Sequence, residues 1–243
     1  MSKANPRALS QAVTHNLLEE IRVGKYKDAK RLPPEDELSS EFGASRSMMR
    51  ECLTELERIG ILNRHKGIGT LINRRIVDIP TRLDIIKGLD SLLGELGYTI
   101  TSPYLNVHQG VADEEVARNL EIPVNSPVLI CERVVATNDK PSLYLCDYIP
   151  ISLLPEKKYI PKEMIPSIFQ FLQEAGIETN MFLTEIRAVG LPEEVAKQLD
   201  METNAPVLHL CETGFDFMNV PVMYTKEYLL DQVIHHMIVR KKI

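Results

Sequence analysis

Residues 33–60, PPEDELSSEFGASRSMMRECLTELERIG, carry the start and stop signals of two short helices in succession. The two prolines suit a first helical turn, and the three acids that follow suit the positive end of a helix dipole. Gly43 ends the first helix, and Ser45 is a suitable N-cap for the second, which ends at Gly60. The stretch therefore predicts two consecutive helices joined by a tight turn.

The sequence on either side adds a further helix and a hairpin. Apolar residues recur every four positions in residues 8–23, which predicts an amphipathic helix. Two β-prone runs, residues 61–64 and 70–72, flank the basic, glycine-containing tip HKGIG at residues 65–69, and this pattern predicts a β-hairpin. Three helices followed by a hairpin form the winged helix-turn-helix arrangement.

Charge is distributed unevenly along the 243-residue chain, whose formal net charge is −6. Residues 1–77 carry a net charge of +4 and residues 78–243 carry −10, which favours a part that meets a polyanion joined to a part that does not. The four cysteines form no CxxC pair, which excludes a zinc ribbon and a dense disulfide framework. No apolar run is long enough to span a membrane, and the start has no apolar signal segment, so we expect a cytoplasmic protein.

The second part of the sequence contains an internal repeat with an offset of 79 residues. EEVARNL at residues 114–120 recurs as EEVAKQL at 193–199, and NSPVL at 125–129 recurs as NAPVL at 204–208. Each copy predicts a short helix, an apolar strand, a polar turn and a second apolar strand. A duplicated unit of this kind predicts an α+β fold whose antiparallel hairpins join in one sheet.

These patterns divide the chain into an N-terminal winged helix-turn-helix domain, residues 1–75, a linker, residues 76–80, and a second domain, residues 81–243. The spacing of apolar residues in 81–96 predicts one more helix at the start of the second domain.

The predicted third helix carries Arg46 and Arg50 four residues apart, so both side chains project from one face. The first turn of a recognition helix reaches base edges in the major groove, and bidentate arginine to guanine is the commonest specific contact. Taken alone, the pair is more simply interpreted as two solvated surface arginines. The basic hairpin tip favours the DNA-binding interpretation, and the candidate DNA contacts are Arg46, Ser47, Arg50, Lys66, Gly67 and Gly69.

Residues 8–73, with the motif RLPPEDELSSEFGASRSMMRECLTELERIGIL followed by KGIGT, resemble the DNA-binding domain of GntR-family transcriptional regulators. The resemblance implies that Arg46, Arg50 and the wing around residues 66–69 contact operator DNA. The family usually has an arginine where this sequence has Asp36, so that contact is missing or supplied elsewhere.

Residues 80–240 resemble, more loosely, the UTRA effector-binding domain of the HutC subfamily, which has a chorismate-lyase-like fold. The similarity lies in the PVL…ER strand, the NDKP turn and the closing PVMYTK strand. It implies a C-terminal antiparallel-sheet domain, a small-molecule pocket between the repeats and dimerisation. The chain is therefore predicted to be a bacterial repressor that binds a pseudo-palindromic operator as a homodimer, with a small-molecule effector, anionic in one interpretation, that modulates DNA affinity.

The resemblance and strand alternation together give candidate effector contacts. Arg133 lies among apolar residues of one strand face, where it either binds an anionic ligand or forms an internal pair with Glu185 or Asp147. The resembled family often has a second arginine two residues after the first and an acid after the Pro-Val pair near the end. This sequence has Val135 and Met223 at these positions, which favours a more apolar effector. The candidates are Arg133, Ser167, Glu185, Arg187, Tyr224 and Lys226, although Ser167 has an alternative role as a plain N-cap and Glu185 with Arg187 as a solvated pair.

Two other classes of protein fit parts of the pattern. A chorismate-lyase-like enzyme with an appended helical domain would need catalytic groups, and residues 80–243 contain no nucleophile–base constellation, phosphate loop or metal-ligand cluster. A constitutive DNA-architectural protein would have no ligand pocket. We therefore expect no enzymatic activity, cofactor or metal.

Overall fold

The structure is a computed structural model that describes residues 6–85, 88, 92–94, 96–155, 168–230 and 236–241. The chain forms two compact units, one made of Met1–Asp84 with His236–Ile243 and the other of Ile85–His235. No helix of the described residues is long and apolar enough to cross a membrane.

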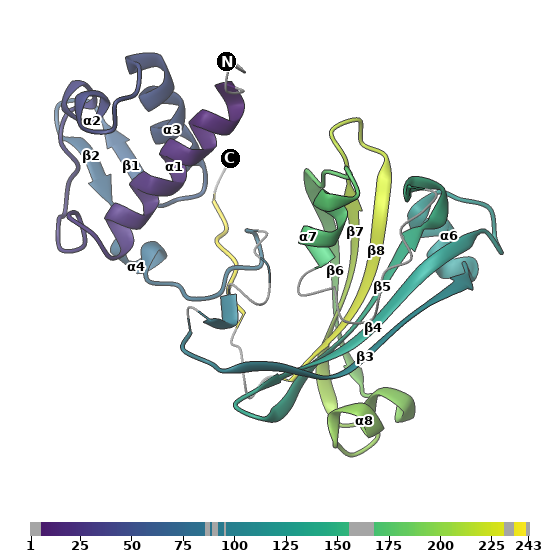
Figure 1. The fold of residues 1–243 in the computed structure, drawn as a ribbon. Helices are drawn as coiled ribbons and strands as arrows, with labels where there is room; N and C mark the ends of the chain where they lie inside the picture. Colours follow the sequence, from purple (N-terminus) through teal and green to yellow (C-terminus); the bar gives the residue numbers. More distant parts are fainter. Residues whose placement is uncertain are drawn as a thin grey trace. The chain divides into compact units, whose positions relative to one another are not determined.

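The first unit is the predicted winged helix-turn-helix (Figure 1). Its elements, in chain order, are α1 (Pro6–Arg22), α2 (Glu35–Glu41), α3 (Arg46–Arg58), β1 (Leu62–His65), β2 (Gly69–Ile72) and α4 (Arg74–Val77). The strands β1 and β2 pair antiparallel as the hairpin that the glycine-containing tip predicts.

The third helix, α3, is held by its N-cap and by its apolar side. The Ser45 hydroxyl accepts a hydrogen bond from the Met48 N–H at 3.2 Å, which satisfies one donor that the helix itself leaves free. Met49, Leu53 and Leu56 are buried against α1, whose Leu17 is fully buried. Burying a leucine side chain contributes roughly 1.5–3 kcal/mol, so this core fixes the orientation of α3.

The short helix α4 anchors the end of the hairpin to α1. The Arg74 guanidinium donates to the carbonyl oxygen of Ile21 at 2.6 Å and also to that of Tyr26. Val77, in the stretch predicted as linker, is 6% exposed and belongs to the core of the first unit. Residues up to Asp84 therefore pack with the winged helix-turn-helix.

The C-terminal segment also packs with the first unit. Met237 forms a parallel bridge with Arg82, and the Lys241 ammonium donates to the Glu57 carbonyl oxygen at 2.7 Å. The prediction of a helix over residues 81–96 is wrong for residues 81–85, because these residues pair with the C-terminal segment. Residues 92–94 are helical, and several of the other predicted positions lie outside the described residues.

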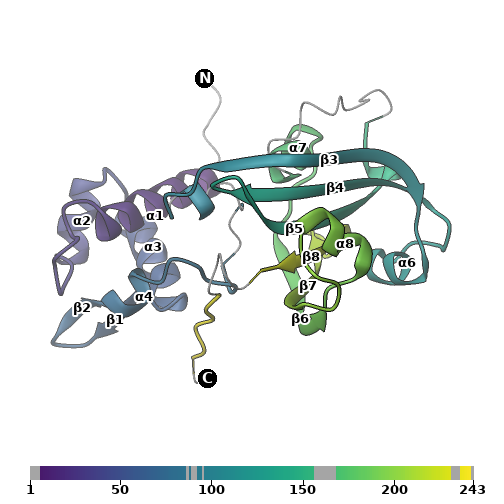
Figure 2. The same cartoon turned by 90° about the horizontal axis from the view of Figure 1, so that it is seen from below.

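The second unit is an α+β domain built on one antiparallel six-stranded sheet, as the repeat predicts (Figures 1 and 2). In spatial order its strands are β3 (Ile100–Val111), β4 (Pro127–Thr137), β5 (Lys140–Pro150), β8 (Pro221–Leu229), β7 (Pro206–Phe215) and β6 (Met181–Gly190). The helical elements are α6 (Glu114–Leu120), η1 (Ile151–Leu153), α7 (Ile168–Glu174) and α8 (Glu193–Leu199).

The repeat is visible in the backbone as well as in the sequence. The helices α6 and α8 both end on a left-handed residue, Glu121 and Asp200, with φ of 54° and 53°. Asn125 and Asn204, which precede the next strands, are also left-handed. The strand β3, which the sequence did not predict, and β6, where Glu185 and Arg187 were expected to share a strand face, complete the copies. The two copies meet where β5 pairs with β8.

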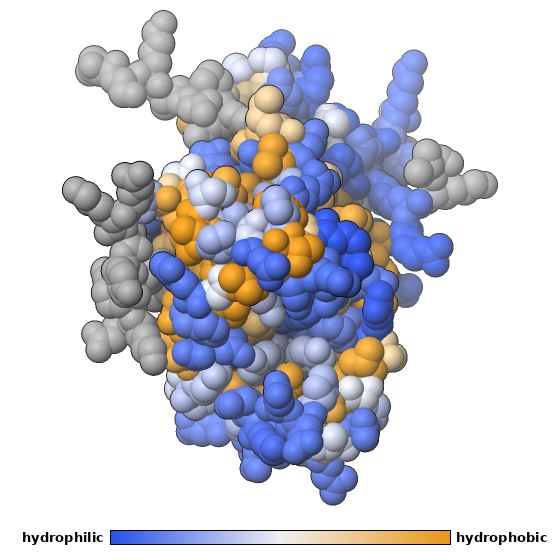
Figure 3. All heavy atoms as spheres, turned by 90° about the vertical axis from the view of Figure 1, so that its right-hand side faces the viewer, coloured by the Kyte–Doolittle hydropathy of each residue, from blue (hydrophilic) through white to orange (hydrophobic). Residues whose placement is uncertain are grey.

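The two faces of the sheet are covered by different helices (Figure 1). Phe171 and Leu172 of α7 pack on one side, and we call this side the α7 face. The helices α6 and α8 pack on the other side, which we call the α6 face. On the side of the molecule in Figure 3, hydrophobic residues form several small patches between hydrophilic ones.

Candidate functional site

The solvent side of α3 presents the predicted recognition residues. The side chains of Arg46 and Arg50 are 72% and 67% exposed, and Ser47 between them is also exposed. Their placement follows from the helical period, because the buried residues of α3 occupy the adjoining side. The structure therefore brings these three residues onto one accessible surface.

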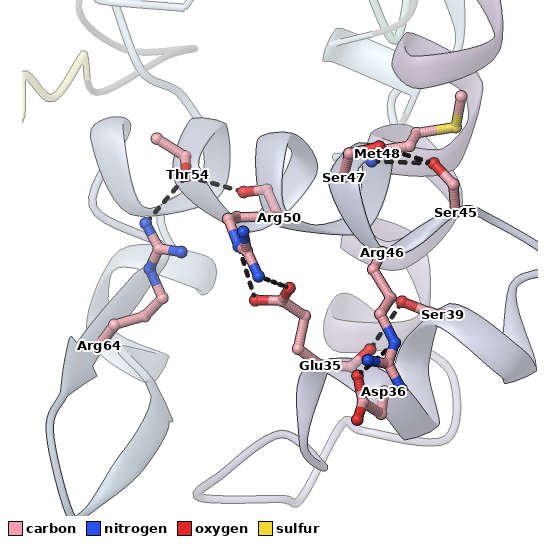
Figure 4. A network of polar contacts seen from close by, with 10 residues as sticks. All are labelled: Glu35, Asp36, Ser39, Ser45, Arg46, Ser47, Met48, Arg50, Thr54 and Arg64. Atoms are coloured by element: carbon pink, nitrogen blue, oxygen red, sulfur yellow. Dashed lines mark hydrogen bonds and ion pairs between the residues drawn. The ribbon is translucent and has the colours of Figure 1, made fainter.

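Each of the two arginines forms an ion pair with an acid of the preceding helix (Figure 4). Arg46 Nε lies 2.9 Å from Asp36 Oδ1, and Arg50 Nη2 lies 2.9 Å from Glu35 Oε1. Exposed pairs of this kind contribute only about 0–1 kcal/mol, so they exchange readily for another anion. Asp36, the departure from the family pattern, is thus an internal counter-ion for Arg46.

The tip of the β1–β2 hairpin presents Lys66, Gly67 and Gly69 to solvent. Both glycines have positive φ, 81° and 100°, a conformation that other residues rarely adopt. Arg31, which precedes α2 in the sequence, donates to the Ile68 carbonyl oxygen at 3.2 Å and so supports the tip. A basic, glycine-containing tip of this form can approach a phosphate backbone closely.

Arg64 of β1 is a further basic residue beside α3, and the sequence reasoning missed it. Its guanidinium pairs with Glu57 at 2.7 Å. It also donates to the Thr54 hydroxyl at 2.9 Å (Figure 4). Only the fold shows this proximity, since the partners lie on a helix and a strand that the sequence pattern does not bring together.

On the α7 face, Arg133 pairs with Asp147, which is one of the two internal partners that the sequence offered. Its Nη2 lies 3.7 Å from Asp147 Oδ2, and the two side chains are only 10% and 1% exposed. Thr225 donates to Asp147 Oδ1 at 2.8 Å. Arg133 Nε and Asp147 Oδ2 nevertheless have no hydrogen-bond partner among the described residues.

Two more carboxylates share the α7 face. Glu212 accepts a hydrogen bond from Thr184 at 2.6 Å. Burial raises the pKa of Asp147 and of Glu212 above their ordinary values. Burial, together with the neighbouring charges of Glu212 and Asp147, raises the pKa of Glu227 to about 8. Three acids therefore share this face of the sheet with one arginine.

The α6 face contains a cavity of about 200 Å³ between α6 and the strands β6, β7 and β8. Its lining includes Glu185, Arg187 and Tyr224, three of the predicted effector residues. Two ion pairs lie at this cavity: Arg187 with Glu185 at 2.7 Å, and Lys226 with Glu115, which also accepts from the Tyr224 hydroxyl at 3.0 Å. Arg118 of α6 also lines the cavity and forms no ion pair with a described residue.

The six predicted effector residues therefore do not form one site. Arg133 lies on the α7 face, whereas Glu185, Arg187, Tyr224 and Lys226 point to the α6 face, and Ser167 lies outside the described residues. The reason is the register: Arg133 is level with Leu145 and Glu227, so the residues before and after Glu227 face the other way.

Comparison with known proteins gives the class of this molecule. Residues 95–232 match the UTRA domain, and residues 9–72 match the family described as "Bacterial regulatory proteins, gntR family". The chain therefore belongs to the gntR family and carries a UTRA domain after its winged helix-turn-helix. Members of this class are ligand-responsive transcriptional regulators and not enzymes.

Individual relatives span nearly the whole chain. The Escherichia coli (strain K12) protein described as "Probable fructoselysine utilization operon transcriptional repressor" is 26% identical over 221 residues, which cover 88% of this chain and 87% of that protein. The transcriptional repressor NagR of Bacillus subtilis is 26% identical over 219 residues, with the same coverage.

Solved structures share the fold. The possible transcriptional regulator YydK from Bacillus subtilis superimposes with a TM-score of 0.72 at 19% identity, over 96% of this chain and 99% of that one. PhnF from Mycobacterium smegmatis gives a TM-score of 0.59 at 20% identity with the same coverage.

The raised pKa of Glu227 predicts a pH-dependent stability. Between about pH 4.5 and about pH 8 the folded protein keeps a proton on Glu227 that the unfolded chain releases, so stability falls as pH rises. Glu227→Gln keeps the group uncharged, and we expect it to melt a few degrees above the wild type at about pH 8, since 1 kcal/mol shifts Tm by about 2–4 °C. The difference shrinks toward about pH 5 in melts followed by circular dichroism. A difference that does not depend on pH contradicts this prediction, and Glu193→Gln, at an exposed position of α8, is the control.

The Arg46–Asp36 pair predicts that Asp36 weakens DNA binding. Asp36→Asn removes a negative charge beside the recognition surface and frees Arg46, so we expect tighter binding to all duplexes by on the order of 1 kcal/mol, about fivefold. Fluorescence anisotropy with labelled duplex DNA measures the change. Glu55→Gln is the matched control, because Glu55 is also paired with an arginine of α3, at 2.6 Å from Arg58. Equal effects of the two substitutions would contradict a local role of Asp36.

Proposed function

We propose that the chain is a cytoplasmic, homodimeric repressor that binds a pseudo-palindromic operator and whose DNA affinity changes when an effector binds to the second unit. The observation that carries this proposal is the exposed Arg46–Arg50 surface on a helix that is held rigidly by a buried core. One recognition helix and one wing offer too little contact for tight specific binding, which supports a dimer on an inverted repeat.

The proposed roles of the DNA-binding residues follow from their positions. Arg46 and Arg50 read base edges in the major groove, and Ser47 contacts the backbone or a base beside them. Lys66 contacts a phosphate or the minor groove, and Gly67 and Gly69 let the wing backbone approach the duplex. DNA binding is proposed for the first compact unit, which extends the predicted domain of residues 1–75 to Asp84 and includes the C-terminal segment, and effector binding and dimerisation are proposed for the second unit.

The α7 face is the better candidate for the effector site. Arg133 and Asp147 are buried there with polar atoms that have no hydrogen-bond partner in the described residues, and such atoms favour a ligand that satisfies them. At the α6-face cavity, Glu185, Arg187 and Lys226 already have ion-pair partners, and no buried polar atom of these residues lacks a hydrogen bond in the described part of the chain. We therefore assign the effector contact to Arg133, and not to Glu185, Arg187, Tyr224 or Lys226.

Substitution of the α3 arginines tests the DNA-binding proposal. Arg46→Ala and Arg50→Ala should each lose about 1–3 kcal/mol of specific binding, because each removes a base contact. Lys66→Ala should weaken binding to every sequence and lower the salt slope by about one unit. The measurement is anisotropy on an operator selected by the wild type from a random duplex library and on a scrambled duplex. A double Arg46→Ala, Arg50→Ala variant that binds this operator like the wild type would refute the assignment.

The edge strand β6 supports a specific mode of dimerisation. It exposes three large apolar side chains, Met181, Leu183 and Ile186, and no described strand pairs with its outer edge. Antiparallel pairing of two β6 strands about a two-fold axis at Ile186 places Glu185 of each copy opposite Arg187 of the other. The strand is therefore complementary in charge to a second copy of itself.

Charge reversal tests this pairing. Glu185→Arg and Arg187→Glu each place like charges opposite one another twice per dimer, and each should weaken self-association by about tenfold. The double variant restores opposite charges and should dimerise like the wild type in sedimentation equilibrium. Met218→Lys, at an 80% exposed turn position, is the control. A dimer that is unaffected by either single reversal would exclude β6 as the interface.

A further inference from the structure

The α7 face carries an excess of negative charge in a largely buried setting. Asp147, Thr225, Glu212 and Thr184 are level with one another across the neighbouring strands β5, β8, β7 and β6. Glu227 lies two residues after Thr225 on β8, and therefore on the same face. The three carboxylates carry a formal charge of −3 when ionised.

Arg133 is the single basic residue that the described strands place among these acids. Its neighbours on β4 and β5, Cys131 and Leu145, are uncharged and buried, and α7 contributes apolar side chains to this face. Val135 is buried where the resembled family has a second arginine. One guanidinium therefore faces three carboxylates.

Polar atoms of the cluster remain without partners. Asp147 Oδ2 and Arg133 Nε have no hydrogen bond within the described residues, although both side chains are at least nine-tenths buried. The Glu227 carboxylate has neither a hydrogen bond nor an ion pair with any described residue, and this side chain is partly exposed. Partial exposure of Glu212 and Glu227 leaves the cluster accessible to a small molecule.

Electrostatics decides which ligand such a cluster favours. Like charges at short range in a buried setting repel strongly, and the protein relieves the repulsion by holding a proton on Glu227, as its raised pKa indicates. An anionic ligand would add a further negative charge beside one arginine that already has a carboxylate partner. A cation would balance the excess and supply N–H donors to the free carboxylate oxygens.

We propose that the α7 face binds the protonated amino group of the effector through Asp147, Glu212 and Glu227, with Arg133 as the fixed counter-charge. The effector is therefore an organic amine, and not a purely anionic compound such as a sugar phosphate. Its non-polar part lies against the apolar residues around the cluster, which include Phe182 and Met223. This inference rests on the proposed function only in taking the α7 face as the effector site.

Three probes of equal size and different charge test the inference. n-Butylammonium is fully protonated at neutral pH, n-butanol is neutral and butyrate is anionic. We expect saturable binding of n-butylammonium to the full-length protein, at least about tenfold tighter than n-butanol, with no binding of butyrate. Ligand-observed NMR measures binding, and isothermal titration calorimetry gives the affinity.

Variants locate the binding on the α7 face. Glu227→Gln removes one carboxylate at a partly exposed position, so the fold is retained, and the affinity for n-butylammonium should fall by about tenfold. Asp147→Asn should act in the same direction, and circular dichroism shows whether this buried variant folds. Glu193→Gln removes an exposed carboxylate of α8, on the other side of the sheet, and should leave the affinity unchanged.

Several results would overturn the inference. These are preferential binding of butyrate, equal binding of all three probes, no binding of n-butylammonium, or amine binding that Glu227→Gln does not weaken. The titrations contain no DNA, so their outcome does not depend on whether the protein acts as a repressor. A protein that binds its operator but not the amine refutes only this inference, and one that binds the amine but no DNA refutes only the proposed function.

Discussion

Antiparallel pairing between β5 and β8 joins the two copies of the repeated unit, and its register decides which polar groups of the second unit share a face. Because Asp147 is level with Thr225, the acids of β5 and β8 lie on the same side as Arg133. A shift of one residue would exchange every side chain of β8 between the two faces. The register would then place Lys226, instead of Glu227, beside Asp147 and Glu212, and the excess of negative charge on the face would disappear.

Sequence patterns predicted the features that depend on local spacing. The N-cap at Ser45, the glycine tip of the wing and the repeated helices α6 and α8 all depend on residues close together in the chain, and the structure has them where the patterns placed them. Alternation also placed Arg133 correctly on its own strand. It could not relate Arg133 to Glu185, because their relative facing depends on pairing across five strands and on β-bulges that no local pattern fixes.

Arginines in both units have carboxylate partners, but burial gives the pairs different properties. The exposed Arg46–Asp36 pair is surrounded by water, so its interaction is weak and Arg46 can be transferred to a phosphate or a base at little cost. The Arg133–Asp147 pair is removed from water, so breaking it leaves a charge that solvent cannot reach. The first arrangement suits a surface that exchanges partners, and the second suits a fixed element of a binding site.

The contacts at the end of α3 give the chain path a mechanical meaning. Arg82, just before the second unit, donates to the Ile59 carbonyl oxygen at 2.7 Å, and Lys241, just after it, donates to that of Glu57. Both strands of chain that connect the units are thus fastened to the last turn of the recognition helix. A movement of either connecting segment therefore acts on the end of α3 through these hydrogen bonds. Because there are two attachments, the orientation of the helix is constrained at two points instead of one.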